Sequence, residues 1–323
     1  MRSTLTLLLA VSSLVLPAQI LQAQTLPVWA YPVASPSPRG AAPPAVDSSV
    51  KHVPGSPAGF TAEQIRDLFQ VPDWFPGSHP LMPSVVSQGR KPAVRACGYC
   101  HLPNGQGRPE NESVAGLPAG YIVQQMADFK SGLRKSSEPK MPSVAGMVLI
   151  GKAATDDEVR EAAAYFSSFH LKPWIRVVET DRVPATLIKG GMLILKEGGK
   201  TEPIGQRVIE VPEDLERTEL RDSSSGFVAY VPKGSLKRGA DLVMTGASGT
   251  TLRCTICHGG DLKGIGNVPS IAGRSPSQMA RQIIDIKNGA RNGPWTQLMK
   301  ETVSKLTDGD IVAITGYLAS RTP

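Results

Sequence analysis

Two segments of the chain carry apolar residues at helical spacing on an otherwise polar background. The first spans residues 113–135 and the second spans residues 270–292. Large side chains form the stripe in each segment: Ile122, Met126 and Phe129 in the first, and Met279, Ile283 and Ile286 in the second. Apolar residues three and four positions apart share one face of an α-helix. We therefore predict one helix in each segment and interpret Met126 and Met279 as core residues.

The two segments also align with each other without a gap, which indicates an internal repeat. Eight residues of the first segment recur 157 positions later: Ser113, Ala115, Gly116, Gln125, Asp128, Lys130, Gly132 and Arg134. Five residues are then missing from the second copy, and the similarity resumes where residues 147–168 match residues 299–320. The chain thus contains two copies of one structural unit.

Each of the later segments contains a threonine suited to a helix N-cap, Thr155 in one and Thr307 in the other. Thr155 with Glu158 matches the capping box. The residues that follow form an apolar face: Val159, Ala162, Ala163 and Phe166 in the first copy, and Ile311, Ile314 and Leu318 in the second. We predict a terminal helix in each repeat, with Tyr165 and Tyr317 at matching positions.

The connection between the repeats, from Leu171 to Lys233, is too long for a simple linker. It contains four stretches in which apolar and polar residues alternate between glycines and prolines: WIRVVET, GGMLILKEGG, QRVIEVP and GFVAYVP. Such alternation predicts short strands. We expect a small β-rich insert that packs across both repeats.

The first residues have the layout of a secretory signal peptide. Arg2 supplies positive charge, Leu5 to Leu16 form an apolar run, and Ala23 suits a cleavage site. An uncleaved membrane anchor is the alternative, but the run is shorter than the ~20 residues that span a bilayer. Residues 24–60 are rich in Pro, Ala and Ser and predict an extended tether. A short helix capped by Thr61 is expected next, up to Phe69.

The formal charge is +7 and aromatic residues make up 5% of the chain. Lys and Arg do not form a run interleaved with aromatic residues, so we do not expect a nucleic acid partner. A basic surface would instead suit an acidic protein partner. After the signal peptide no segment approaches the length of a membrane span, so we expect an exported, soluble protein without a membrane span.

All four cysteines belong to two CxxC pairs, and a histidine directly follows each pair. The two motifs are Cys97, Cys100 and His101, and Cys254, Cys257 and His258. Two disulfides are one alternative in an oxidising compartment, but they would not explain the histidines. A four-cysteine zinc site is another, but its pairs normally lie much closer in sequence. CxxCH is the attachment motif of haem c, in which two thiols bind the porphyrin and the histidine binds iron.

A methionine stands eight residues before the cap threonine in each repeat, Met147 in the first and Met299 in the second. A thioether opposite the histidine would complete six-coordination of iron and raise its reduction potential. Met141, beside Pro142, is the alternative in the first repeat, but it has no counterpart in the second. Three further histidines lack a repeat counterpart and are interpreted as surface residues: His52, His79 and His170.

With these motifs each repeat resembles a class I cytochrome c domain: CxxCH near the start, a middle helix, a Met loop and a capped terminal helix. The whole chain resembles a two-domain dihaem cytochrome c of bacterial periplasms. The resemblance implies a mainly α fold with two such domains in tandem, joined by the small β-rich insert. The expected divisions are a signal peptide (1–23), a Pro-rich N-terminal extension (24–81), domain 1 (82–170), the insert (171–235) and domain 2 (236–323).

The resemblance also implies two covalently bound haem c groups. The expected attachment residues are Cys97, Cys100, Cys254 and Cys257, and the expected axial ligands of iron are His101, Met147, His258 and Met299. In the family, a proline carbonyl commonly orients the iron-binding histidine. Pro269 stands at that position in the second repeat, but the first repeat has no aligned proline, so the contact that orients His101 is not accounted for.

We predict an electron carrier rather than an enzyme, because ligands on both faces of iron leave no open position for a substrate. The expected role is single-electron transfer in the periplasm, from a dehydrogenase or other donor to a downstream cytochrome or oxidase, or as the cytochrome subunit of a dehydrogenase. A dihaem cytochrome c peroxidase is the main alternative. Two weaker alternatives are a haem-based sensor and a thiosulfate-oxidising enzyme with a cysteine ligand to iron, although the thioethers would use all four cysteines.

Overall fold

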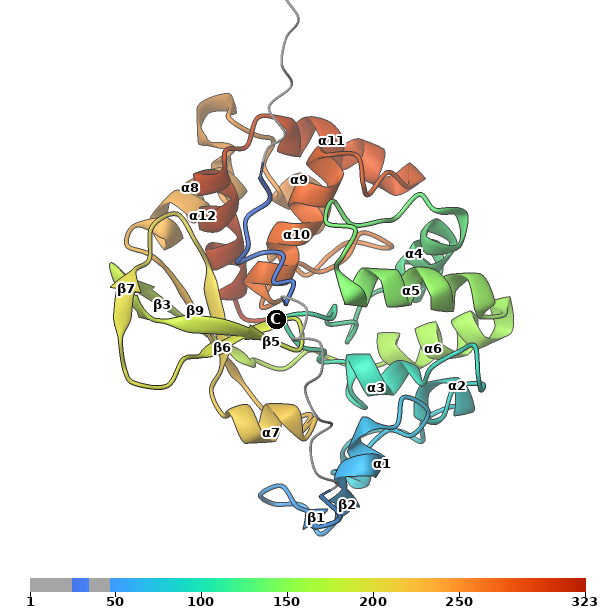
Figure 1. Cartoon of the computed structure of the whole chain (residues 1–323). Coiled ribbons are helices and arrows are strands. Elements are labelled where there is room, and N and C mark those ends of the chain that lie inside the picture. The colour runs from blue at the N-terminus through green and yellow to red at the C-terminus, as the bar shows by residue number, and fades with distance from the viewer. Residues whose placement is uncertain (1–24, 35–46) are drawn as a thin grey trace, which may run out of the picture.

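Helices dominate the two ends of the chain and short strands dominate its middle (Figure 1). The computed structural model describes residues 25–34 and 47–323, so the signal peptide expected at 1–23 lies outside the described residues. Short elements precede the first CxxCH motif: β1 (Val50–Lys51), β2 (Phe60–Thr61), α1 (Ala62–Arg66), η1 (Pro76–Ser78) and α2 (Ser84–Ser87). Within these described ranges, no helix is both long and apolar enough to cross a membrane.

Four helices form the body of the first repeat: α3 (Cys97–His101), α4 (Ala119–Ser131), α5 (Pro142–Ala153) and α6 (Asp156–Ser167). The predicted middle and terminal helices are confirmed as α4 and α6, and α4 packs against both α5 and α6. Helix α4 ends at Gly132, which has a φ of 76°. Glycine adopts this left-handed conformation without a steric penalty, so the chain can turn sharply there.

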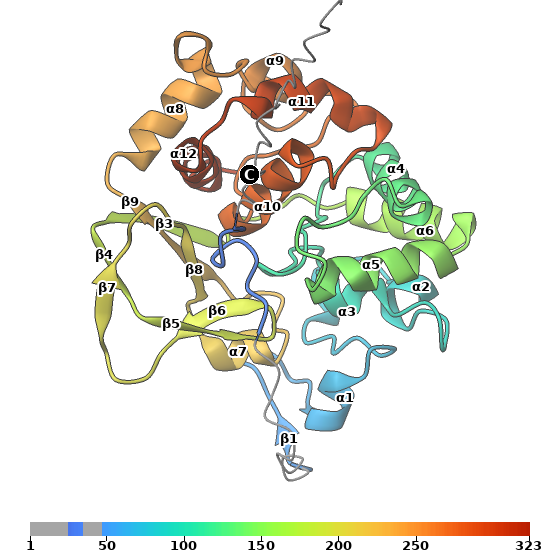
Figure 2. The same cartoon turned by 45° about the horizontal axis from the view of Figure 1, so that its top comes forward.

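The second repeat has the matching helices α9 (Thr255–His258), α10 (Pro276–Lys287), α11 (Gln297–Ser304) and α12 (Asp308–Ala319), together with α8 (Ser235–Thr245), η2 (Ala247–Gly249) and η3 (Pro294–Thr296). The predicted helices are confirmed here as α10 and α12. Helix α12 packs along α8 and also contacts α10. Figure 2 shows these helices beside those of the first repeat, with the strands on the other side of α8 and α12.

Both terminal helices begin with the expected threonine cap. The hydroxyl of Thr155 accepts from the backbone N–H of Glu158 at 3.2 Å, and the Glu158 carboxylate accepts from the Thr155 N–H at 2.8 Å. Thr307 and Asp310 form the same reciprocal pair at the start of α12. Each box satisfies two backbone N–H groups that the helix itself cannot pair, which fixes where the helix starts.

Seven strands and one helix lie between the repeats: β3 (Ile175–Thr180), β4 (Arg182–Pro184), β5 (Thr186–Lys189), β6 (Met192–Leu195), β7 (Thr201–Pro203), β8 (Ile209–Pro212), α7 (Leu215–Glu219) and β9 (Phe227–Pro232). Three of them form a sheet of order β3-β9-β8, with β3 parallel and β8 antiparallel to β9. The other four pair as β4 with β7 and β5 with β6.

The strands share a hydrophobic core with the second repeat. Buried residues of β8 and β9, among them Val211 and Val231, belong to the same cluster as Leu242 of α8 and Ile314 of α12. The first repeat has a smaller core of its own around Phe166. Polar contacts join the strand region to the first repeat, such as the Arg221 guanidinium donating to the Tyr99 carbonyl at 2.8 Å.

The expectation of an extended tether is wrong for residues 25–34. Trp29, Ala30 and Tyr31 are buried in the core of the second repeat. The Tyr31 hydroxyl donates to the Asp285 carboxylate at 2.8 Å, and Arg281 donates to the Ala30 carbonyl at 2.8 Å. Two aromatic side chains bury enough apolar surface to outweigh the freedom that a proline-rich segment would otherwise keep. The short helix expected after Thr61 is confirmed as α1.

Candidate functional site

The side chains of the first CxxCH motif border a cavity between the helices of the first repeat. Cys97, Cys100 and His101 of α3 all line this cavity. Most of the lining is apolar: Val85, Val94, Leu117, Ile122, Phe129, Ile150, Val159 and Phe166. Two thiols and an imidazole beside one apolar space are the donor set that a covalently attached haem requires.

The same cavity has a polar part. Arg134 and Arg281 contribute to its lining, next to Gln278 and Gln282 of the second repeat. Haem carries two carboxylate side chains on an otherwise apolar ring. Guanidinium groups are suited to bind carboxylates, so this lining suits haem in charge.

A backbone carbonyl holds the imidazole of His101. Its Nδ1 lies 2.7 Å from the carbonyl oxygen of Glu112, and this geometry places the ring proton on Nδ1. Burial lowers the pKa of His101 more than the Glu112 contacts raise it. The ring is therefore neutral at physiological pH, and Nε2 keeps the lone pair that an iron ligand needs.

His258 is held in the same way in the second repeat. Its Nδ1 donates to the carbonyl oxygen of Pro269 at 2.8 Å, and burial again lowers the pKa of the ring. Pro269 is the residue that the sequence analysis singled out for this contact. Glu112 stands at the matching position of the first repeat, eleven residues after its histidine, and supplies the carbonyl that the missing proline left unaccounted for.

Three of the four cysteines, Cys97, Cys100 and Cys254, have the properties of protected thiols rather than of a redox pair. All four are unpaired in the structure. Burial raises the pKa of Cys97 to about 12 and that of Cys254 to about 11. Catalytic CxxC motifs instead lower the thiol pKa, because the thiolate is the reactive form. The environment therefore does not favour thiol–disulfide exchange.

Both candidate methionine ligands lie on helices, so the expected Met loops are wrong. Met147 is on α5 and Met299 is on α11. Pro142 occupies the first turn of α5, where its missing N–H costs nothing, and the helix then continues through Met147. Met147 borders the cavity together with His101, whereas Met141 does not and is only 1% exposed.

The other methionines and histidines singled out in the sequence have different surroundings. Met279 is buried in the core as predicted, but Met126 borders the cavity. The expectation that His79 is a surface residue is wrong: its side chain is only 4% exposed and contacts the Asp73 carboxylate at 3.1 Å and the Tyr165 hydroxyl at 3.3 Å. His52 Nδ1 lies 2.9 Å from the Ala58 carbonyl. Neither His52 nor His79 is among the residues that line the cavity.

Several known proteins are similar to this chain over most of its length. Cytochrome c4 of Azotobacter vinelandii is 26% identical over 253 residues, which cover 75% of this chain and 90% of that protein. The thiosulfate dehydrogenase electron acceptor of Stutzerimonas stutzeri (strain A1501) is 25% identical over 236 residues, covering 72% of this chain and 82% of that protein. Reduced recombinant cytochrome c4 from Pseudomonas stutzeri has a TM-score of 0.46 at 20% identity, covering 70% of this chain and 93% of that one. No family model matches the chain.

Over about three quarters of its length the chain is thus similar to cytochromes c4. Its two CxxCH motifs supply the attachment residues for two covalently bound haem c groups.

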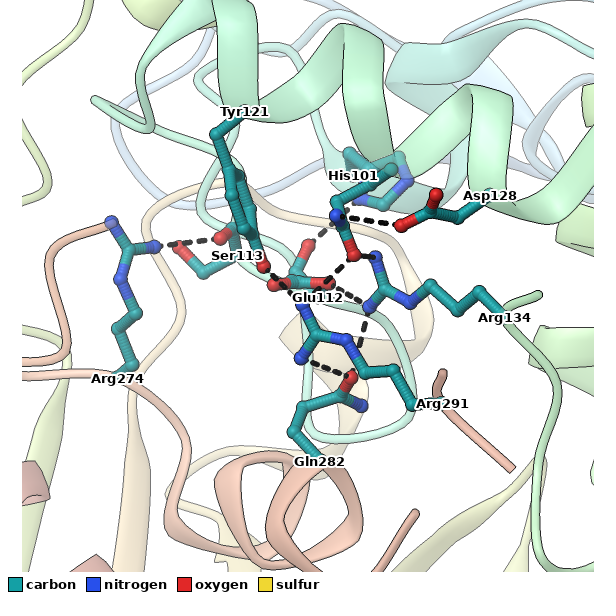
Figure 3. Close-up of polar contacts among 10 residues, drawn as sticks. His101, Glu112, Ser113, Tyr121, Asp128, Arg134, Arg274, Gln282 and Arg291 are labelled. Atoms are coloured by element: carbon teal, nitrogen blue, oxygen red, sulfur yellow. Dashed lines mark hydrogen bonds and ion pairs between the residues drawn. The ribbon is translucent and has the colours of Figure 1, made fainter. Parts of the chain in front are cut away.

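A network of four side chains joins the two repeats, and the sequence analysis did not foresee it; Figure 3 labels Arg134, Gln282 and Arg291 of this network. Arg134 donates to Gln125 and to Gln282, each at 3.0 Å. Arg291 donates to the same two amide oxygens, to Gln125 at 2.8 Å and to Gln282 at 3.1 Å. The backbones of Arg134 and Arg291 also form an antiparallel bridge. We call these four residues the Arg/Gln square.

The square consists of two pairs of repeat-related residues, because Gln125 matches Gln282 and Arg134 matches Arg291. The available signal in the sequence was that these polar residues recur at matching positions of the two repeats, although the CxxCH motifs do not require them. One carboxylate breaks the symmetry: Glu112 forms an ion pair with Arg134 at 2.6 Å. Burial by itself would raise the pKa of Glu112, but Arg134, Arg291 and Arg274 together hold it below its usual range.

Proposed function

We propose that this chain is a dihaem c-type cytochrome that carries electrons, in which both irons have a histidine and a methionine ligand. Cys97 and Cys100 would attach the first haem and Cys254 and Cys257 the second. The axial ligands would be His101 with Met147 and His258 with Met299. The observation that carries the proposal is the matched treatment of the two histidines, whose Nδ1 atoms bind equivalent carbonyls at 2.7 and 2.8 Å.

The bound haem supplies the one-electron chemistry, and the residues of the chain control its surroundings. Apolar side chains such as Phe129 and Phe166 keep water away from the first site. The Nδ1 hydrogen bonds fix the plane of each imidazole and increase its basicity. Met147 and Met299 would supply soft sulfur ligands, which favour a high reduction potential. Two protein ligands for each iron would allow the haem to supply one-electron chemistry without an exchange of ligands.

The proposed partners are other redox proteins of the periplasm. Two relatives carry the name thiosulfate dehydrogenase electron acceptor, which supports a dehydrogenase as the electron donor and a downstream cytochrome or oxidase as the acceptor. The net charge of +7 favours partners with an acidic docking face. Periplasmic location rests on the signal peptide predicted at residues 1–23.

We also propose that the two cytochrome domains comprise residues 82–170 and 236–323, with residues 171–235 as an insert between them and 24–81 as an N-terminal extension. The strand region supports this division, since it separates α6 from α8. The location of the strand region supports a role in holding the two domains together. It shares a core with the second repeat and donates or accepts hydrogen bonds with the first, as between Asn104 and the Ser223 carbonyl at 2.7 Å.

Haem counting tests the attachment residues. Mature protein made with haem available should contain two haems that survive acid–acetone extraction and that add to its intact mass. Cys97→Ala with Cys100→Ala should remove one covalent haem, and the matched Cys254→Ala with Cys257→Ala should remove the other. Recovery of Cys97–Cys100 and Cys254–Cys257 as disulfides in haem-replete protein would contradict the proposal.

Spectroscopy of the half-reduced protein separates a carrier from a dihaem peroxidase. If thioethers occupy both distal positions, both haems should stay low-spin after addition of one electron per molecule. Peroxide should then be consumed no faster than by a simple cytochrome c. A high-spin haem that appears on half-reduction, together with rapid peroxide turnover, would show the enzyme instead of the carrier.

A further inference from the structure

The turns that follow His101 and His258 have the same backbone hydrogen bonds, but a different type of residue supplies the carbonyl that orients each histidine. In the first, Gly107 N–H donates to the His101 carbonyl at 2.9 Å, and in the second Gly264 N–H donates to the His258 carbonyl at 2.8 Å. Short bridges then close both turns at matching residues, Arg108 with Asn111 and Ile265 with Val268. In each turn the carbonyl that orients the histidine belongs to the residue directly after the bridge.

That next residue is Pro269 in the second domain and Glu112 in the first. The proline ring fixes φ near −65°, so the orienting carbonyl has little freedom of its own. Glutamate has no such restriction. Its backbone N–H makes no hydrogen bond within the described part of the chain, so the peptide is held mainly from its carbonyl and its side chain.

The side chain of Glu112 is anchored at the domain interface. Its carboxylate accepts from Arg134 at 2.6 Å, and the side chains of Arg134 and Glu112 are only 7% and 20% exposed. Arg134 in turn belongs to the Arg/Gln square and binds Gln282 of the second domain. Figure 3 shows this chain of contacts from His101 through Glu112 and Arg134 to Gln282.

We propose that Glu112 is a positioning residue for His101, and that its ion pair with Arg134 does for the first haem what the proline ring does for the second. The orientation of His101 then depends on the domain interface, whereas that of His258 depends on its own loop. This proposal rests on the proposed function, because it requires that His101 binds haem iron. Its physical basis is that a partner of a ligating histidine sets the plane and the basicity of the ring.

The test uses three variants of the haem-loaded full chain. Glu112→Gln removes the ion pair, Arg134→Gln removes it from the other side, and Glu112→Pro installs the arrangement of the second domain. Two NMR readouts report on the histidines: the hydrogen exchange rate of each Nδ1–H, and the pattern of the hyperfine-shifted haem methyl signals, which depends on the ring plane. His258 and its haem serve as the control within the same molecule.

We expect about tenfold faster Nδ1–H exchange at His101 in Glu112→Gln and in Arg134→Gln, with an altered methyl pattern for the first haem only. In Glu112→Pro both readouts should remain as in the unmodified protein, and adding Arg134→Gln to it should change neither. This last comparison removes the simple effect of charge, because Glu112→Pro and Glu112→Gln lose the same carboxylate.

Unchanged exchange at His101 in both Glu112→Gln and Arg134→Gln would overturn the proposal. So would a Glu112→Pro variant that loses the His101 signature as fully as Glu112→Gln does. Haem content is measured first on the unmodified protein, and fewer than two haems there would refute the proposed function itself. The two failures are therefore distinguishable.

Discussion

The choice between Met147 and Met141 as the distal ligand of the first haem leads to a prediction in which stability and spectrum respond to different residues. Met141 is 1% exposed and precedes α5, whereas Met147 is partly exposed and borders the cavity with His101. Replacing a fully buried methionine by alanine removes packing and leaves a cavity, which costs about 2–5 kcal/mol. Met141→Ala should therefore lower the free energy of unfolding by that amount and leave the iron–sulfur bond intact.

Met147→Ala should have the opposite profile. The weak near-infrared band of oxidised haem, which arises from sulfur-to-iron charge transfer, should lose about half its intensity, because one of the two haems loses its thioether. Met299→Ala should remove the other half, and the double variant should have no band. The reduction potential of the first haem should fall, because a thioether ligand raises it.

Absorption spectra of the oxidised variants and denaturant titrations of the same samples test this assignment together. Loss of half the band in Met141→Ala, with an intact band in Met147→Ala, would show that the repeat alignment selected the wrong methionine. Retention of the full band in both would point to another sulfur, and Met126 would then be the residue to replace, since it also lines the cavity.

Three further predictions concern charge. Burial raises the pKa of Glu210 despite hydrogen bonds from Ser275 and Ser277, so the unfolded state loses this proton at a lower pH than the folded state does. The free energy of unfolding should therefore fall as pH rises above about 4.3. In urea titrations Glu210→Gln should flatten this pH dependence, and an unchanged dependence would refute the role of Glu210. Arg291→Ala should cost about 3 kcal/mol by leaving buried partners unpaired, while the exposed Arg160→Ala should change stability by less than about 0.5 kcal/mol; equal effects would refute a role for the square. Electron exchange with an acidic redox protein should slow as salt rises, because the Debye length is ~10 Å at 0.1 M; a rate independent of salt would exclude steering by the net charge.

Local patterns predicted the helices because helix formation is decided largely by neighbours within a few residues. The Thr155 and Thr307 caps, the apolar stripe of α4 and the one of α10 were all legible in this way. The expectation of Met loops failed for a related reason. The absence of a strong cap before Met147 concealed the start of α5, which Pro142 begins without a side-chain cap.

Contacts between segments distant in sequence left no such pattern. Residues 25–34 looked like a tether because of their composition, yet Tyr31 binds Asp285, some 250 residues away. The same limit applies to Glu112. Its role follows from a carbonyl position, which every residue type can supply, and from an ion pair with Arg134, which lies 22 residues further along the chain.

The Arg/Gln square explains why Gln125 and Arg134 recur in the second repeat although neither is a haem ligand. In an interface with two-fold symmetry every contact occurs twice. Here the contact of Arg134 with Gln282 has its counterpart in the contact of Arg291 with Gln125. Each amide oxygen of the square accepts from both guanidinium groups, and this arrangement requires the same pair of residue types in both domains. Glu112 and Pro269 lie outside that constraint and differ. The two histidines therefore have the same ligand geometry but different support, and only the support of His101 extends through Arg134 to the other domain.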